Sequence, residues 1–313
     1  MAKAFVFPGQ GSQAVGMGQA LAEAFGPARE VFEEVDEALQ QKLSRLMHEG
    51  PLEELTLTEN AQPAIMAVSL AVVRVLEREG GIDLAAKADF VAGHSLGEYS
   101  ALAAAGAFGL ADAARLLRQR GNAMRAACEP GVGAMAAIMG MGAEALEPVV
   151  AEAAQGEVCE IANDNSPVQV VVSGHHDAVL RAMELAKPLG GRRSQLLAVA
   201  APFHCSLMAP AAEVMEEALD KSDLAPPALP VMANVTAAPV SGPAEIRQLL
   251  VQQVTGRVRW RESVLALQEA GVEQLVELGA GKVLSGLARR IHPDLEGVAC
   301  GTPEDIDSLL KAL

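Results

Sequence analysis

The stretch FVAGHSLGE, residues 90–98, decides the fold because it joins a short apolar segment to a helical one through a turn. It contains the pattern G-x-S-x-G, with Ser95 between Gly93 and Gly97. After a strand and before a helix, this pattern is typical of a nucleophile elbow, which raises the serine hydroxyl above the sheet. The main-chain N–H of Leu96 can then face a developing oxyanion. The alternative is a tight strand-to-helix turn with a solvated serine.

Outward from this turn, short β-rich runs that end at glycine alternate with alanine- and leucine-rich helical segments. This alternation predicts an α/β fold with a largely parallel sheet. The expected strands lie near 3–7, 88–93, 230–234, 273–278 and 296–300. The expected helices lie at about 12–25, 27–48, 60–79, 96–105, 110–127, 205–221, 243–254, 260–270, 281–291 and 304–312.

The middle of the chain breaks this alternation. From GAMAAIMG to RSQLLAV the pattern predicts strand, helix, strand, strand, helix, strand, which is the order of a ferredoxin-like unit. We therefore expect a small domain at 131–199, inserted into a larger domain that consists of 1–130 and 200–313.

Composition and charge narrow the classes of function. Half of the 313 residues are apolar and a fifth are charged, which is typical of a globular protein. A net charge of −16 argues against nucleic acid or anionic lipid as a partner. The longest uncharged stretches, 194–212 and 224–244, are broken by prolines, and the N-terminus lacks the apolar run of a secretory signal. We expect a cytoplasmic protein.

A nucleophilic serine needs a base, and His204 is the candidate because it ends the uncharged run LLAVAAPF. The alternative for His204 is a buried histidine with a structural role. His94 adjoins Ser95, so its side chain should point away from the hydroxyl. No aspartate stands out as a third member, and a main-chain carbonyl or an amide such as Gln253 could orient the imidazole instead.

The N-terminal stretch FPGQGSQA, residues 7–14, formally satisfies a dinucleotide fingerprint after a strand. The second strand with its acidic residue is missing, because 30–37 has the pattern of an amphipathic helix. A glycine loop whose N–H groups face the neighbouring elbow is the better interpretation. No C-x-x-C pair occurs among the four cysteines, so neither a zinc knuckle nor a redox dithiol is expected.

Four arginines lie on the helix that follows the elbow helix: Arg115, Arg118, Arg120 and Arg125. Any that turned inward near Ser95 would need an anionic partner, and a substrate carboxylate is a natural one. Their spacing does not tell which of them that is.

Six motifs occur in the order seen in the malonyl-CoA:acyl carrier protein transacylases of fatty acid synthesis: FPGQGSQ, GHSLGEYSAL, RLLRQRGNAM, NDNSPVQVVVSG, APFHCSLM and ELGAGKVLSGL. The chain resembles this family over essentially its whole length. The resemblance extends to acyltransferase domains of polyketide synthases, but the compact chain looks like the free-standing bacterial enzyme. It implies an α/β-hydrolase-like large domain with a ferredoxin-like insert, and a monomer is compatible with it.

The resemblance also implies a reaction. Ser95 would be the acylated nucleophile, His204 its base, and Arg120 the residue that holds the free carboxylate of the malonyl group. The malonyl group would pass from malonyl-CoA to Ser95, and then to the pantetheine thiol of acyl carrier protein, in a ping-pong reaction. No cofactor or metal is expected.

Five further site residues follow from the matching motifs. Gln10 and Leu96 would supply the N–H groups of the oxyanion hole. The main-chain carbonyl of Gln253 would orient the histidine, and Asn163 and Asn165 would line the site from the small domain.

One segment departs from the pattern of the family, and one residue bears on which acyl group the chain would accept. The segment TGRVRW, residues 255–260, lacks the Asn-Pro that many relatives have before Val-x-Trp, which puts the loop near Gln253 in doubt. Phe203 resembles acyltransferases that take malonyl, because a bulky ring there would crowd an α-methyl branch. Discrimination against one methyl group is worth about 1–3 kcal/mol.

Two other functions remain open on this sequence. A serine hydrolase or thioesterase would use the same elbow, with water as the second acceptor. A catalytically silent protein would bind the carrier without being acylated. Carrier proteins are typically acidic, so a docking surface on this acidic chain would have to be locally basic. The candidate clusters are Arg192 with Arg193, Arg257 with Arg259 and Arg261, and Lys282 with Arg289 and Arg290.

Overall fold

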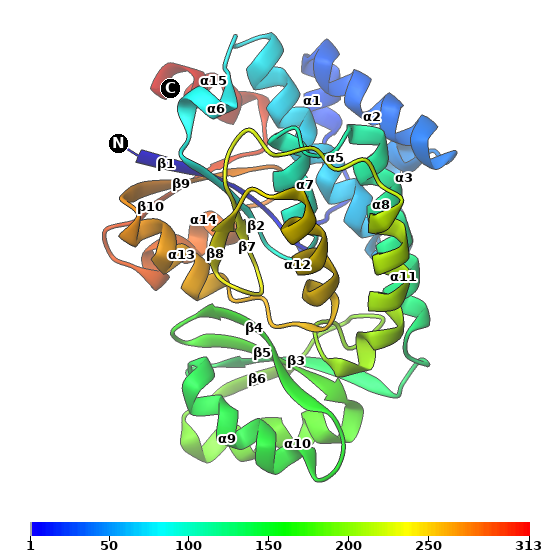
Figure 1. Cartoon of the computed structure of the whole chain (residues 1–313), viewed down its shortest axis with the longest axis vertical. Coiled ribbons are helices and arrows are strands. Elements are labelled where there is room, and N and C mark those ends of the chain that lie inside the picture. Colours follow the sequence, from blue (N-terminus) through cyan, green and yellow to red (C-terminus); the bar gives the residue numbers. More distant parts are fainter. Residues whose placement is uncertain (1) are drawn as a thin grey trace.

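A computed structural model of the chain describes residues 2–313 and contains two separate sheets (Figure 1). The larger sheet has the strand order β10-β9-β1-β2-β7-β8. Its strands are β1 (Ala2–Phe7), β2 (Phe90–Gly93), β7 (Val231–Ala233), β8 (Ala238–Val240), β9 (Val272–Leu278) and β10 (Glu296–Cys300). All neighbours are parallel except the edge strand β8. The predicted α/β class is confirmed.

Strand β1 lies in the centre of this sheet because its residues are apolar on both faces. Phe5 and Phe7 pack into one core, whereas Ala4 and Val6 pack into a second core that includes Trp260. Burial on both faces is typical of a parallel strand that helices cover from either side.

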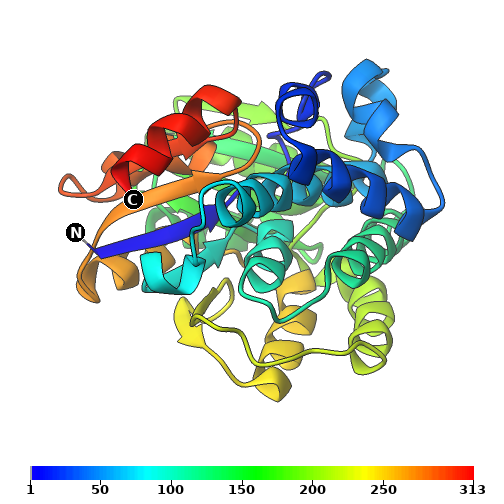
Figure 2. The same cartoon turned by 90° about the horizontal axis from the view of Figure 1, so that it is seen from above.

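We call the larger sheet and the helices packed around it the large part of the molecule. These helices lie on both faces of the sheet (Figures 1 and 2). Helices α13 (Trp260–Glu269) and α14 (Val283–Ile291) cover the face with Trp260. The other core includes α2, α5, α7, α8, α11 and α12. The remaining bounds are α1 (Gln19–Ala24), α2 (Gly26–Leu39), α3 (Leu43–Glu49), α4 (Leu52–Thr56), α5 (Thr58–Arg78), α6 (Leu84–Lys87), α7 (Leu96–Ala104), α8 (Leu110–Ala126), α11 (Ala209–Asp220), α12 (Pro243–Thr255) and α15 (Pro303–Ala312).

The second sheet is antiparallel, with the order β4-β5-β3-β6. In chain order its part of the molecule contains β3 (Gly133–Met139), α9 (Ala143–Ala154), β4 (Cys159–Ser166), β5 (Gln169–His175), α10 (His176–Ala186), the short 3-10 helix η1 (Lys187–Leu189) and β6 (Arg193–Leu196). This is the predicted order of elements. Ile138 and Val172 pack against the two helices, whereas Met135 and Val171 on the opposite face join the core of the large part. The small sheet therefore packs one of its faces against its own two helices and the other against the large part.

Two predicted helices differ from the structure at their glycines and turns. The helix expected at 12–25 begins only at Gln19, because Gly16 and Gly18 have φ values of 92° and 78° that a right-handed helix excludes. The helix expected at 27–48 is two helices, since Gln40 has a left-handed conformation between them.

The edge strand β8 was not predicted, because Pro239 at its centre argues against a strand. Proline is tolerated there because an edge strand pairs on one side only. Within residues 2–313, no helix combines the length and the apolar character needed to cross a membrane.

Candidate active site

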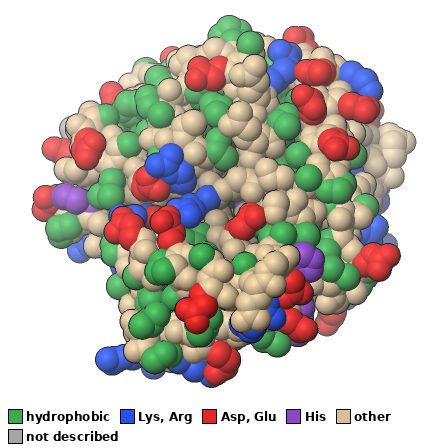
Figure 3. Space-filling view, turned by 60° about the horizontal axis from the view of Figure 1, so that its bottom comes forward, with side chains coloured by type: hydrophobic (Ala, Val, Ile, Leu, Met, Phe, Trp, Pro, Cys, Tyr) green, Lys and Arg blue, Asp and Glu red, His purple; other side chains and the backbone are tan. Residues whose placement is uncertain are grey.

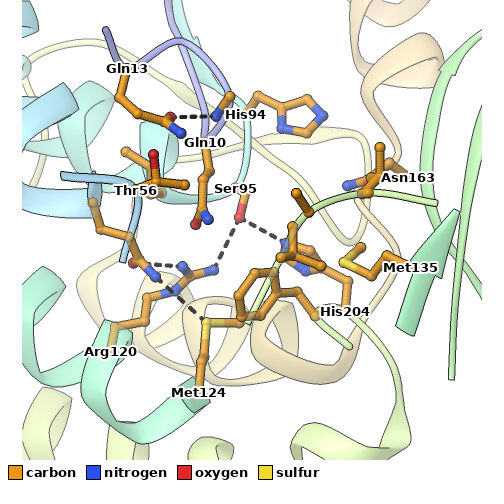
Figure 4. A pocket seen from close by; sticks show the side chains of 17 residues that line it. Gln10, Gln13, Thr56, His94, Ser95, Arg120, Met124, Met135, Asn163 and His204 are labelled. Atoms are coloured by element: carbon orange, nitrogen blue, oxygen red, sulfur yellow. Dashed lines mark hydrogen bonds between the residues drawn. The ribbon is translucent and has the colours of Figure 1, made fainter. Parts of the chain in front are cut away.

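The site lies where three neighbouring parallel strands end. Gln10 follows β1, Ser95 follows β2 and Asn234 follows β7, so all three residues lie at the same edge of the sheet. In open α/β sheets this edge is where ligands bind. Arg120 on α8 and His204, in the loop before the 3-10 helix η2 (Ser206–Met208), complete the group (Figure 4).

Ser95 has the strained backbone of a nucleophile elbow, with φ 54° and ψ −111°. This conformation lies outside the region that residues with a side chain usually occupy, and it costs about 1–3 kcal/mol. The turn also needs two glycines. A Cβ on Gly93 would lie 1.9 Å from the carbonyl carbon of Gly97, and a Cβ on Gly97 would lie 2.3 Å from the carbonyl oxygen of Phe7.

Asn234 holds this strained turn from the end of β7. Its Oδ1 accepts a hydrogen bond of 2.7 Å from the Ser95 N–H, and its Nδ2 donates to the Gly93 carbonyl at 2.7 Å. Gln253 on α12 donates through Nε2 to the Ser95 carbonyl at 3.0 Å. Sequence reasoning missed Asn234. The available signal was a polar residue directly after the buried strand VMA, at the edge where the elbow also lies.

Ser95 and His204 form a hydrogen-bonded pair. The Ser95 Oγ and the His204 Nε2 are 2.7 Å apart, and His204 Nδ1 lies 2.9 Å from the main-chain carbonyl of Gln253 and 3.2 Å from that of Gly256. A carbonyl accepts only, so Nδ1 carries the hydrogen and Nε2 is left to accept the serine proton. Among residues 2–313, no carboxylate is hydrogen-bonded to the His204 ring.

Burial and the nearby positive charge of Arg120 lower the pKa of His204 to about 3, although the two carbonyl contacts oppose this shift. The imidazole is therefore neutral at neutral pH and able to act as a base.

Arg120 is the arginine of α8 that turns inward, with a side chain only 1% exposed. Its Nη1 donates to Gln62 Oε1 at 2.8 Å, and its Nη2 donates to Gln253 Oε1 at 2.8 Å and to Ser95 Oγ at 3.2 Å. The ring of Tyr99 lies 5.7 Å from the guanidinium carbon. Among residues 2–313 no carboxylate forms an ion pair with Arg120, so a buried positive charge faces the Ser95 hydroxyl without an anion in contact.

The other three arginines of α8 lie elsewhere. Arg115 is exposed and pairs with Asp112, Arg125 is exposed and pairs with Glu59, and Arg118 is half-buried away from the site. Arg120 is thus the arginine of α8 that turns inward near Ser95, which the helical spacing alone did not decide.

A cavity of about 290 Å³ connects these groups, and its wall includes Gln10, Leu96, Asn163 and Phe203. This volume lies at the small end of the range for ligand sites, which suits a short acyl group. Asn165 lies beside the cavity, with its Oδ1 2.8 Å from His94 Nε2. Figure 4 shows the His94 ring directed away from the Ser95 hydroxyl, as expected.

The main-chain N–H groups of Gln10 and Leu96 donate to no acceptor in the described part of the chain. The Gln10 side chain is held by the Thr58 hydroxyl, which donates to Oε1 at 3.0 Å. Two unused N–H groups beside a nucleophile are what an oxyanion hole requires.

The N-terminal glycine loop packs against the elbow. A Cβ on Gly9 would lie 2.8 Å from the carbonyl oxygen of His94, so this glycine permits close approach of two loops. Across residues 2–313, no group of three or more His, Cys, Asp or Glu side chains is arranged to hold a metal ion.

One of the three basic clusters is neutralised by neighbouring carboxylates. Arg257 pairs with Glu147, Arg259 with Glu262, and Arg261 with Asp164 at 2.9 Å. On the face that Figure 3 shows, Lys and Arg side chains lie among Asp and Glu side chains and do not form one large basic patch.

The model of a known protein family, described as the acyl transferase domain, matches residues 4–290. The chain belongs to this acyl transferase family. A curated relative of this acyl transferase is the malonyl CoA-acyl carrier protein transacylase of Bacillus subtilis (strain 168), 46% identical over 99% of this chain and 96% of the relative. The protein of the same name from Escherichia coli (strain K12) is 43% identical over 98% of each chain.

Solved structures agree with this assignment. The acyl-carrier-protein-S-malonyltransferase from Bartonella henselae is 54% identical to this acyl transferase, with a TM-score of 0.97 over 100% of this chain and 99% of the other. A malonyl-transacylase solved in complex with its type II polyketide synthase acyl-carrier protein is 40% identical, with a TM-score of 0.96 over 100% of both chains. The resemblance stated from the sequence is confirmed.

Proposed function

We propose that this acyl transferase moves the malonyl group of malonyl-CoA to the phosphopantetheine thiol of acyl carrier protein, and so supplies malonyl-acyl carrier protein for fatty acid synthesis. The observation that carries this proposal is Arg120, a buried guanidinium 3.2 Å from the Ser95 hydroxyl with no carboxylate in contact among residues 2–313. Relatives that are named malonyl transacylases and match almost the whole chain support the same substrate.

In the first half-reaction, neutral His204 takes the proton of Ser95 through Nε2 while Oγ attacks the thioester carbon. The N–H groups of Gln10 and Leu96 donate to the oxyanion of the tetrahedral intermediate. The intermediate collapses to an ester on Ser95, and the departing CoA sulfur receives the proton from His204.

The second half-reaction runs in reverse with a new thiol. The pantetheine thiol of the carrier gives its proton to His204, and its sulfur attacks the malonyl ester. The Ser95–acyl bond then breaks, and the serine oxygen recovers the proton from His204. The imidazolium formed in each half is held by the carbonyls of Gln253 and Gly256.

Arg120 selects the acyl group in this scheme. A guanidinium binds a carboxylate through two parallel hydrogen bonds, and in a buried site such a pair is charge-assisted and strong. The pair also sets the distance between the carboxylate and the reacting carbonyl, which positions the thioester for attack by Ser95. Phe203 in the cavity wall leaves less room for an α-branch.

We also propose that 1–130 and 200–313 form the catalytic domain and 131–199 the small domain. The two separate sheets and the separate apolar core of the small part support this division. The small domain contributes Asn163 to the cavity wall. We place the enzyme in the cytoplasm, where we expect its acyl-CoA donor and carrier protein.

The test is the intact mass of the protein after brief incubation with malonyl-CoA, beside a Ser95→Ala variant. We expect one malonyl adduct that the variant lacks and that leaves the protein when pantetheinylated carrier is added. Slow loss without carrier and fast loss with it distinguishes a transferase from a hydrolase, whereas equal rates would refute the transferase. An unacylated wild-type protein would refute the malonyl substrate.

A further inference from the structure

Glu98 is a buried carboxyl group that the mechanism above does not use. It lies on α7 three residues after Ser95, and its side chain is 2% exposed. Its Oε2 accepts a hydrogen bond of 3.1 Å from the Asn234 N–H and one of 2.7 Å from Gln253 Nε2. In the described chain no Lys or Arg forms an ion pair with Glu98. A buried carboxylate without a contacting cation is costly, so its position calls for an explanation.

The Gln253 carboxamide connects Glu98 to Arg120. On one side, Nε2 donates to Glu98 Oε2 at 2.7 Å and to the Ser95 carbonyl at 3.0 Å. On the other side, Oε1 accepts from Arg120 Nη2 at 2.8 Å. The opposite orientation would place an amide oxygen against two oxygens and an NH₂ group against a guanidinium. The three neighbours therefore fix the direction of this amide.

The connection answers two requirements of Arg120. A buried guanidinium needs acceptors and a nearby negative charge, but a carboxylate in direct contact would occupy the donors that a substrate needs. The Gln253 amide oxygen accepts a hydrogen bond from the guanidinium. Glu98 lies on the other side of this amide, so it supplies a nearby negative charge without contacting the guanidinium. Gln62 Oε1 satisfies Nη1 at 2.8 Å without adding a charge.

We propose that Glu98 is a positioning residue for substrate specificity: through the Gln253 carboxamide it holds the Arg120 guanidinium toward Ser95, and it leaves the donors that Gln62, Gln253 and Ser95 do not use for a dicarboxylic acyl group. This inference deepens the proposed function and rests on it. Glu98 itself touches neither substrate nor the reacting atoms.

The ionisation of Glu98 makes the inference testable. A carboxylate only accepts hydrogen bonds, so it fixes the Gln253 amide, whereas a protonated carboxyl can also donate and allows the amide to turn. Burial raises the pKa of Glu98 to about 7, against hydrogen bonds from Gln253 and Asn234 and the charge of Arg120. The titratable groups that face it are Arg120 from α8 and Tyr99 from its own helix, with neutral His204 across Ser95.

The experiment measures acyl-enzyme formation by rapid quench and intact mass, with malonyl-CoA and acetyl-CoA as donors, from about pH 5.5 to 8.5. The ratio of the two kcat/KM values is the readout. In the wild type we expect the malonyl preference to rise with a midpoint near the pKa of Glu98, about 7. In Glu98→Gln we expect a preference lowered about 10- to 100-fold and independent of pH.

Glu277→Gln is the matched control. Glu277 is also fully buried, and it accepts hydrogen bonds from the N–H groups of Leu284 and Ser285 at the start of α14, away from Arg120. This variant should lose stability but keep the wild-type preference and its pH dependence.

A Glu98→Gln variant with the wild-type preference, or a wild-type preference that is constant across pH 7, would overturn the inference. The wild-type profile decides the question even where the variant does not fold. Absence of a malonyl adduct on the wild type would instead refute the proposed function.

Discussion

Replacement of Arg120 with alanine is the sharpest test of how this site selects its substrate. The variant removes the guanidinium that contacts the Ser95 hydroxyl, and with it the proposed partner of the malonyl carboxylate. Loss of one member of a buried charged pair costs about 3–5 kcal/mol. At about 1.4 kcal/mol for each factor of ten, kcat/KM for malonyl-CoA should fall about 10²- to 10⁴-fold.

Acetyl-CoA has no carboxylate for Arg120 to bind. With this donor, the variant should lose only the hydrogen bond between Arg120 Nη2 and Ser95 Oγ, which is long at 3.2 Å. Such a hydrogen bond is worth about 1 kcal/mol. The malonyl-to-acetyl ratio should therefore fall at least about 30-fold.

The assay compares acyl-enzyme formation with the two donors at saturating and subsaturating concentrations. Arg125→Ala is the control, because Arg125 lies on the same helix but is exposed and pairs with Glu59. The unfolding temperature of each variant separates a change of selectivity from a loss of folded protein. An unchanged ratio in folded Arg120→Ala would refute the assignment of this arginine to the carboxylate.

Three further changes test the electrostatics and the packing around the site. The folded-state pKa of His204, about 3, lies below its unfolded value of 6.5. Its contribution to stability is thus fully present above pH 6.5 and is lost as the pH falls toward 3. When the pH falls from 7 to about 4.5, the unfolding free energy of the wild type, measured with urea, should fall by about 2–3 kcal/mol more than that of His204→Gln. Equal decreases of unfolding free energy in the two proteins would contradict the shifted pKa of His204. Asn234→Ala leaves the Ser95 N–H and the Gly93 carbonyl unpaired and should cost about 2–4 kcal/mol of unfolding free energy in the same assay, with slower acylation; a loss near zero would show that the turn needs no such support. Asp164→Asn removes the fully buried carboxylate that pairs with Arg261, where β4 of the small sheet meets helix α13, and should cost about 1–3 kcal/mol of unfolding free energy. The unfolding temperature should fall; an unchanged temperature would mean that the contact between β4 and α13 does not depend on this ion pair.

The elements that local sequence determines were predicted well. The glycines on either side of Ser95 indicate the elbow because the turn itself has no room for side chains at these two positions. A Cβ on Gly93, for example, would overlap the main chain of Gly97. The five parallel strands of the larger sheet were found, unlike the antiparallel edge strand β8, because an apolar run that is buried on both faces can be recognised without knowledge of its partner strand. The start of the first helix was predicted too early. The helical composition of 12–25 was given more weight than the tendency of Gly16 and Gly18 to adopt positive φ values.

The support of the site could not be predicted in the same way. Asn234 and Ser95 are 139 residues apart in sequence, and Glu98 is 155 residues from Gln253. Such hydrogen bonds depend on which strand ends meet, which no local pattern contains. Gln253 was predicted for its main-chain carbonyl, whereas its side chain also joins Glu98 to Arg120. Glu98 had one visible sign, an acidic residue within the apolar helix LGEYSALAA.

The close packing of the elbow limits how this enzyme can be engineered. Because neither Gly93 nor Gly97 can accept a Cβ, directed evolution has no room to vary the turn that carries the nucleophile. New acyl specificities must come from the cavity wall, where Met124, Met135 and Phe203 present side chains that can be exchanged for larger or smaller ones. A library confined to these three positions would sample pocket shape while the reactive centre stays intact.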